Sequence, residues 1–193
     1  LITNKTQREF IHRTISIPNS KVHPIGVEIE TEDLISVMQL RMYRELVFPI
    51  GGKDFISNNP LIAAEQLYQS NLMELLESLH EGEGAYYFRI ECKSPMSLDE
   101  RSDFSKKLSA KLERISEGKL INSPSDYEIE IRLIANREGK FFPCLKVFTI
   151  KDNRFAYRKN VIASSIHPFY FDNFDTVDHK YLQSDLIKLL NGE

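Results

Sequence analysis

The chain has 193 residues, a formal net charge of −3 and 41% hydrophobic residues, values that are ordinary for a soluble globular protein. No apolar run approaches the roughly 18 residues of a membrane-spanning helix and no signal sequence opens the chain, so we expect no membrane partner. Cys92 and Cys144 lack metal-ligand spacing, which predicts reduced thiols in a cytoplasmic protein. Because residue 1 is leucine, we expect the chain to be a piece of a longer protein.

Charge is unevenly distributed along the chain. Residues 61–84 carry five acidic side chains and no Lys or Arg, whereas residues 85–171 carry sixteen Lys and Arg against eleven Asp and Glu. A polyanion is expected to bind where positive charge is in excess. The second of these stretches is therefore where nucleic-acid contacts are predicted.

The first fifty residues predict a strand at residues 10–17, a strand at 25–31, a helix and a short strand at 47–50. Pro18-Asn19-Ser20 links the first two strands, and Thr31 is the predicted helix cap. This order resembles the second half of a ferredoxin-like domain, and residues 51–59 have the composition of a linker.

Residues 60–79 predict two helices. Pro60 occupies the first position of one, where its missing N–H costs nothing, and Ser70-Asn71 opens the next. His80 and the residues up to Gly84 are interpreted as a flexible loop, since the second histidine of a zinc-protease sequence is missing.

Residues 85–150 read as strand, helix, strand and strand. Residues 85–93 and 127–133 alternate between apolar and polar side chains, as half-buried strands do. Between them, Ser97 and Glu100 form a capping box, and Gly118 ends the long helix. A turn at residues 136–139 leads into a strand at 142–150. We expect a small α+β sheet with helices on one face, a right-handed crossover between the first two strands and a hairpin at its edge.

Two stretches of this pattern resemble the THUMP family. They are Tyr87-Phe88-Arg89-Ile90-Glu91-Cys92-Lys93 and Ser123-Pro124-Ser125-Asp126-Tyr127-Glu128-Ile129-Glu130-Ile131-Arg132. The usual sequence motifs of the family at these two places are F-R-V-x-x-K and N-P-D-x-x-I-x-V-x-I. Ser125, which intrudes between Pro124 and Asp126, is a small departure that affects no chemistry. The resemblance covers about 90 residues, and its motifs are determinants of the fold rather than catalytic signatures.

The resemblance implies an α+β chain with a partial ferredoxin-like domain at residues 1–55 and a THUMP domain at 56–152. Residues 153–193 would be a junction toward a missing catalytic domain, ending in a helix at about 177–190. THUMP domains bind RNA in tRNA- and rRNA-modifying enzymes. Residues 163–168 resemble the junction that leads into a class I methyltransferase domain, so the covalently linked catalytic domain would use S-adenosylmethionine. A 4-thiouridine synthetase is the alternative parent.

The chain itself shows no catalytic or cofactor motif. No glycine-rich strand–helix turn follows Pro168, and no Ser/His/Asp or Cys/His arrangement can be argued from the five dispersed histidines. We therefore predict no catalytic residue, no metal and no cofactor in this chain, and the oligomeric state is left open.

We predict that a set of basic side chains binds structured RNA, either tRNA or rRNA, through its phosphates. They are Arg89, Lys93, Arg101, Lys106, Lys107, Lys111, Arg137, Lys140, Lys146, Arg154, Arg158 and Lys159, with the aromatic Tyr157 among the last three. Arg89 and Lys93 would form a basic ledge beside Tyr87, which would serve as an aromatic platform.

Each group has an alternative reading. Asp103 could pair with Lys107 on a solvated helix face, and Arg89 and Arg132 could neutralise Glu91, Glu128 and Glu130 on the sheet. The stretch around Arg158 could be a solvated linker. A protein-interaction module without RNA affinity is then the competing function.

Overall fold

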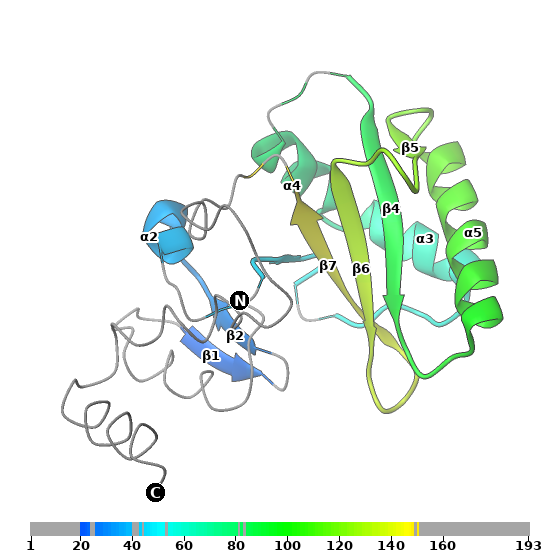
Figure 1. Cartoon of the computed structure of the whole chain (residues 1–193), viewed down its shortest axis with the longest axis horizontal. Helices are drawn as coiled ribbons and strands as arrows, with labels where there is room; N and C mark the ends of the chain where they lie inside the picture. Colours follow the sequence, from blue (N-terminus) through cyan, green and yellow to red (C-terminus); the bar gives the residue numbers. More distant parts are fainter. Residues whose placement is uncertain are drawn as a thin grey trace, which may run out of the picture. The chain divides into compact units, whose positions relative to one another are not determined.

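A computed structural model of the chain describes residues 20–23, 26–39, 43, 45–52, 54–80, 82, 84–148 and 150. The chain divides into two compact units, one of Leu1–Leu46 with Asp152–Glu193 and one of Val47–Lys151 (Figure 1). The strand predicted at residues 10–17, the terminal helix and the predicted contacts Arg154, Tyr157, Arg158 and Lys159 lie outside the described residues.

In the first unit, β1 (Ser20–His23) and β2 (Gly26–Ile29) form an antiparallel pair in which Val22 lies opposite Val27. Strand β2 falls within the predicted strand at 25–31. Strand β1 was not predicted, because Val22 is its one aliphatic residue and the strand owes its conformation to pairing with β2.

Helix α2 (Leu34–Gln39) follows in the same unit, and Asp33 rather than Thr31 caps its first turn. Asp33 Oδ1 accepts a hydrogen bond from the Ser36 N–H at 3.0 Å, while Thr31 Oγ1 accepts from the Asp33 N–H. The Ser36 hydroxyl also donates to Asp33, and this bond lowers the pKa of the Asp33 carboxyl.

The second unit contains a five-stranded sheet in the order β3-β7-β6-β4-β5 (Figure 1). Its strands are β3 (Phe48–Pro49), β4 (Tyr86–Lys93), β5 (Leu120–Asn122), β6 (Ile129–Ala135) and β7 (Phe141–Val147). Strand β4 is parallel to both β5 and β6, and β7 is antiparallel to β6 and β3. The mixed sheet with its β6–β7 hairpin confirms the predicted α+β fold class.

Three details of the sheet differ from the sequence-based expectation. The hairpin is not at the edge, because β3 pairs with β7 through Phe48 and Leu145. The strand predicted at residues 47–50 therefore belongs to this sheet and not to the N-terminal unit. Strand β5, which was not predicted, follows α5 and pairs with β4, where the Tyr86 N–H donates to the Lys119 carbonyl. At three residues β5 is too short to show an alternating pattern.

Helices α3 (Pro60–Gln69), α4 (Leu72–Leu79) and α5 (Leu98–Ile115) begin where the sequence predicts. Asn59 Oδ1 accepts from the first N–H groups of α3, and Ser97 and Glu100 form the predicted capping box of α5. Asn71 does not cap α4 through its side chain. Its Oδ1 accepts from the Gly51 N–H at 2.7 Å and so ties the linker before α3 to the start of α4.

Left-handed backbone ends α5 as predicted, since Gly118 has φ +84°. Glu117, immediately before it, also has a positive φ of 52°. The turn between β6 and β7 likewise contains Gly139 at φ +77°, and the Asn136 N–H donates to the Lys140 carbonyl.

The core lies between these helices and one face of the sheet, and α3 lies behind the sheet in Figure 1. Leu67, Leu76, Leu108 and Leu112 from the helices and Phe88, Ile129, Ile131 and Leu145 from the strands are fully buried in one cluster. Burying each such side chain contributes roughly 1.5–3 kcal/mol. Because side chains alternate along a strand, the remaining strand residues point to the other face, which we call the second face.

The second face is defined by the strand register. Its residues are Tyr87, Arg89, Glu91 and Lys93 of β4, Glu130, Arg132 and Ile134 of β6, and Phe142, Cys144 and Lys146 of β7. Arg89 lies opposite Glu130, which lies opposite Lys146. The predicted contacts on β4 and β7 therefore meet on this face.

Neither cysteine of the sheet forms a disulfide. Cys92 and Cys144 are both buried free thiols, one on each face of the sheet. Burial raises the pKa of both, and that of Cys144 reaches about 11. In the described part of the chain, no helix combines the length and the apolar character required to cross a membrane.

Candidate nucleic-acid interface

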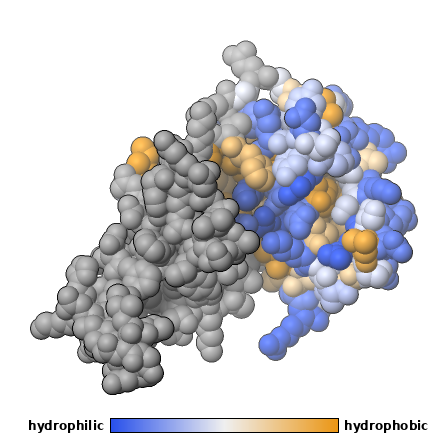
Figure 2. All heavy atoms as spheres, viewed as in Figure 1, coloured by the Kyte–Doolittle hydropathy of each residue, from blue (hydrophilic) through white to orange (hydrophobic). Residues whose placement is uncertain are grey.

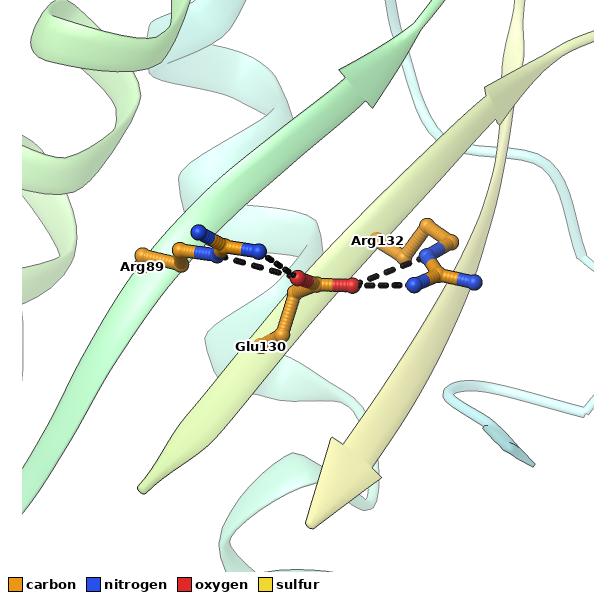
Figure 3. Close-up of polar contacts among 3 residues, drawn as sticks. All are labelled: Arg89, Glu130 and Arg132. Atoms are coloured by element: carbon orange, nitrogen blue, oxygen red, sulfur yellow. Dashed lines mark hydrogen bonds and ion pairs between the residues drawn. The ribbon is translucent and has the colours of Figure 1, made fainter. Parts of the chain in front are cut away.

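An ionic cluster of three residues occupies the middle of the second face (Figure 3). Glu130 Oε2 accepts from Arg89 Nε at 2.9 Å and from Nη2 at 2.6 Å. Its other oxygen, Oε1, accepts from Arg132 Nε at 2.9 Å and from Nη2 at 2.5 Å. Arg89 lies opposite Glu130 on the parallel neighbour, and Arg132 lies two residues along the same strand, so the alternation of the strands brings all three together.

Burial decides how these charges behave. The side chains of Glu130 and Arg132 are 2% and 5% exposed, while that of Arg89 is 34% exposed. Burial alone would oppose ionisation of Glu130, but the hydrogen bonds from Arg89 and Arg132 outweigh it, so the pKa of this carboxyl lies below its usual range. The three side chains carry two positive charges and one negative charge, and Arg89 is the most accessible of them.

Aromatic rings and cations form a second group next to this cluster. Arg89 Cζ lies 4.1 Å from the centroid of the Tyr127 ring, and Lys146 Nζ lies 4.8 Å from that of Phe148. The two rings meet edge to face, with centroids 5.3 Å apart and an interplanar angle of 80°. We call Arg89, Tyr127, Phe148 and Lys146 the cation–aromatic cluster.

Sequence reasoning identified only part of this cluster. It named the cations and associated Arg89 with Tyr87, its neighbour on the same face of β4, whereas the structure places Tyr127 against the guanidinium. Phe148 was missed although it lies within the strand predicted at 142–150, because only the cation Lys146 was selected from that strand. Tyr87 and Phe148 are 44% and 41% exposed, which is high for large hydrophobic side chains.

His80 was interpreted from the sequence as part of a flexible loop, but its side chain is only 4% exposed and forms hydrogen bonds through both ring nitrogens. Its Nδ1 accepts from the Gly82 N–H at 2.9 Å, and its Nε2 lies 3.0 Å from Glu128 Oε2. This arrangement assigns the ring proton to Nε2, which donates to Glu128. The Tyr86 ring packs against the imidazole at 5.2 Å. His80 therefore joins the end of α4 to the residues that lead into β6.

The predicted contacts on α5 lie on a helix that covers the core face, so they do not join those on the second face. Lys107 Nζ pairs with Asp103 at 2.7 Å, as the alternative reading proposed, and Lys111 Nζ pairs with Glu65 of α3 at 2.7 Å. Lys106 is exposed and Arg101 is half-buried. Half of the predicted α5 group is thus engaged with carboxylates.

The remaining predicted residues lie near the ends of strands. Arg137 and Lys140 are exposed at the β6–β7 turn, where Lys140 Nζ lies 3.9 Å from Glu138, and Lys93 is exposed at the end of β4. The predicted RNA contacts that the structure describes therefore lie on three surfaces: the second face, α5 and the hairpin turn. The pairing of Arg89 and Arg132 with Glu130 matches the alternative reading of the sheet, and contact of any of these residues with RNA remains a prediction.

Other kinds of site find little support in the residues that the structure describes. No group of three or more His, Cys, Asp and Glu side chains there could hold a metal ion. An open pocket of about 290 Å³ lies between the segment after β3 and helix α3, with Asp54, Gln66 and Ser70 in its lining. The described residues of its lining include no Lys or Arg, so they offer no cation to a phosphate. Seen as in Figure 1, the surface of the second unit is mainly hydrophilic with scattered hydrophobic residues (Figure 2).

No protein-family model and no curated protein matches the chain. Among solved structures, the crystal structure of PH1313 from Pyrococcus horikoshii Ot3 is similar, with a TM-score of 0.40 and 10% sequence identity. The match covers 72% of this chain and 46% of that one, so it spans less than half of the length of PH1313.

Proposed function

We propose that the chain is an RNA-binding module. The observation that carries this proposal is the second face of the sheet, where two arginines share one buried carboxylate and Arg89 and Lys146 lie over aromatic rings. Cations that neutralise phosphates provide most of the sequence-independent affinity for RNA, and aromatic rings beside them suit bases. The sequence motifs in β4 and in the residues up to Arg132, which resemble those of the THUMP family, also support RNA binding.

The parent protein that we propose is a class I RNA methyltransferase acting on tRNA or rRNA. Residues 163–168, which resemble the junction into such a catalytic domain, support this choice over a 4-thiouridine synthetase. The catalytic domain would be covalently linked to this chain, and S-adenosylmethionine would bind there. The chain described here would contribute docking of structured RNA.

A protein-interaction module is the second candidate, and specific ion pairs favour it. Lys107 and Lys111 are held by Asp103 and Glu65, so two of the predicted RNA contacts are already neutralised. If the other cations are simply solvated, partner binding would be insensitive to salt and RNA affinity would be absent.

Filter retention of a bulk tRNA and of a structured rRNA fragment separates the two candidates. With six to ten phosphate contacts, affinity for a duplex-like RNA should fall about a thousandfold or more between roughly 50 and 200 mM salt. Absence of retention at about 50 mM salt would refute the RNA-binding proposal.

Three matched variants locate the interface, because each removes one cation from a different surface. Lys93→Gln changes the second face, Lys106→Gln changes α5 and Arg137→Gln changes the hairpin turn. All three residues are exposed, and no carboxylate of the described residues lies within 4 Å of their charged groups. Loss of one phosphate contact should reduce the slope of log affinity against log salt concentration by about one. We expect this reduction for Lys93→Gln, and we expect Lys106→Gln to leave the slope unchanged.

A further inference from the structure

We propose that the cation–aromatic cluster stacks an unpaired base, so that this module recognises RNA carrying a single-stranded segment. The inference rests on the proposed function and names the feature of the RNA that the second face would bind. The base would stack on the rings of Phe148 and Tyr127, and Arg89 and Lys146 lie beside these rings.

The geometry favours a base as the occupant. Phe148 keeps 41% of its surface exposed although Tyr127 and Lys146 contact it. The edge-to-face contact with Tyr127 fixes the orientation of the Phe148 ring, and attraction to the ring quadrupole holds the Lys146 cation against it. An ordered, exposed ring flanked by cations is the arrangement on which single-stranded nucleic acid stacks.

A paired base could not use this surface. In an A-form duplex each base is stacked between its neighbours, and the deep major groove hides the base edges from side chains. Bases of loops, bulges and ends are available for stacking on protein rings. A surface that offers ring faces therefore distinguishes unpaired RNA from duplex, while phosphate contacts bind both.

Glu130 positions the cation of this site. Its Oε2 accepts hydrogen bonds from Nε and Nη2 of Arg89, and among the described residues Nη1 of Arg89 has no hydrogen-bond partner. The guanidinium is thereby held over Tyr127, with its remaining N–H groups available to a phosphate next to the stacked base. Glu130 is a positioning residue in this account, since it acts through Arg89.

The experiment uses the whole chain and two RNA probes, an unstructured oligonucleotide of about ten nucleotides and a blunt-ended duplex. The chain contains no tryptophan, so Phe148→Trp introduces a single tryptophan at the proposed stacking ring, and its fluorescence can be excited apart from that of the tyrosines. We expect its fluorescence to be quenched by the unpaired oligonucleotide and to change little with the duplex.

Affinity measurements complete the test. Phe148→Leu should weaken binding of the unpaired oligonucleotide by roughly five- to 150-fold, the range expected for loss of stacking on one base, and binding of the duplex by less than about twofold. Phe55→Leu is the matched control, because Phe55 is 45% exposed and belongs to no part of the cluster. Thermal unfolding of each variant establishes that it is folded.

The possible results separate this inference from the proposed function. If both probes bind but Phe148→Leu and Tyr127→Leu leave the affinity for the unpaired probe unchanged, the stacking site is wrong and RNA binding stands. Equal quenching of Phe148→Trp by duplex and by unpaired RNA would also overturn it. If neither probe binds at about 50 mM salt, the proposed function and this inference both fail.

Discussion

Replacing Glu130 by glutamine should destabilise the second unit strongly. The carboxylate is shared by Arg89 and Arg132, and the substitution removes its charge while leaving the shape of the side chain almost unchanged. The two guanidinium groups would then lose the negative charge that they share. Glutamine could still accept a hydrogen bond through its one carbonyl oxygen, so the loss is mainly electrostatic.

The exposures of the three side chains set the magnitude. Glu130 and Arg132 are 2% and 5% exposed, so Glu130→Gln removes one charged member of a buried ion pair, a change that costs about 3–5 kcal/mol in other proteins. Arg89, at 34% exposed, can be hydrated by solvent, and its pair contributes at most about 1 kcal/mol. With one acceptor retained, we expect a loss near the lower limit, about 3 kcal/mol in the free energy of unfolding.

Urea unfolding at pH 7 measures this loss. Asp103→Asn is the matched control, since it removes the carboxylate of an exposed pair whose side chains are 58% and 62% exposed, and it should cost no more than about 0.5 kcal/mol. If Glu130→Gln costs as little as Asp103→Asn, the reasoning from burial is refuted.

Acidification tests the same carboxylate without a substitution. Because the pKa of Glu130 is lowered by folding, its contribution to stability is complete above the ordinary value of about 4.5 and is lost as the pH falls through the lower pKa of the folded state. The wild-type chain should therefore lose stability below about pH 4.5 more steeply than Glu130→Gln. Parallel pH profiles for the two proteins would contradict this assignment.

Three further predictions concern packing, thiol chemistry and backbone. Leu108→Ala, at a fully buried position, should lower the free energy of unfolding in urea by about 2–5 kcal/mol, whereas Leu98→Ala at a 74% exposed position of the same helix should stay within about 0.5 kcal/mol. Cys92 and Cys144 should react slowly with a thiol reagent at about pH 8 in the folded chain and rapidly in urea, because burial raises the pKa of both. Gly139→Ala should cost about 1–2 kcal/mol by thermal unfolding, since φ there is +77° while the added methyl would meet only an ordinary contact; an unchanged melting temperature would contradict this strain.

Local rules predicted the elements of the second unit well. The capping box at Ser97 and Glu100, Pro60 at the start of α3 and the left-handed Gly118 after α5 depend on residues within one or two turns of each other. The alternation in β4 and β6 assigned their faces correctly for the same reason. Such signals are complete in a short stretch of sequence, so no tertiary information is needed to read them.

Pairing between distant segments was the part that local patterns could not determine. Strand β3 joins β7 almost a hundred residues later, and β5 is a strand only because β4 lies beside it. Each is too short to show a period, so its conformation follows from hydrogen bonds to its neighbour.

The candidate site shows the same division. The sequence by itself determined that basic and aromatic residues occur in the β4 and β6 segments and that Arg89 and Glu130 point away from the core. Only the tertiary structure decided that Glu130 receives both arginines, that Tyr127 rather than Tyr87 lies under Arg89, and that Lys107 and Lys111 are paired with carboxylates. The reason is physical. A charged side chain on a strand or helix pairs with the group that strand register and packing of the neighbouring elements bring within a few ångströms. The local sequence pattern determines neither the register nor the packing.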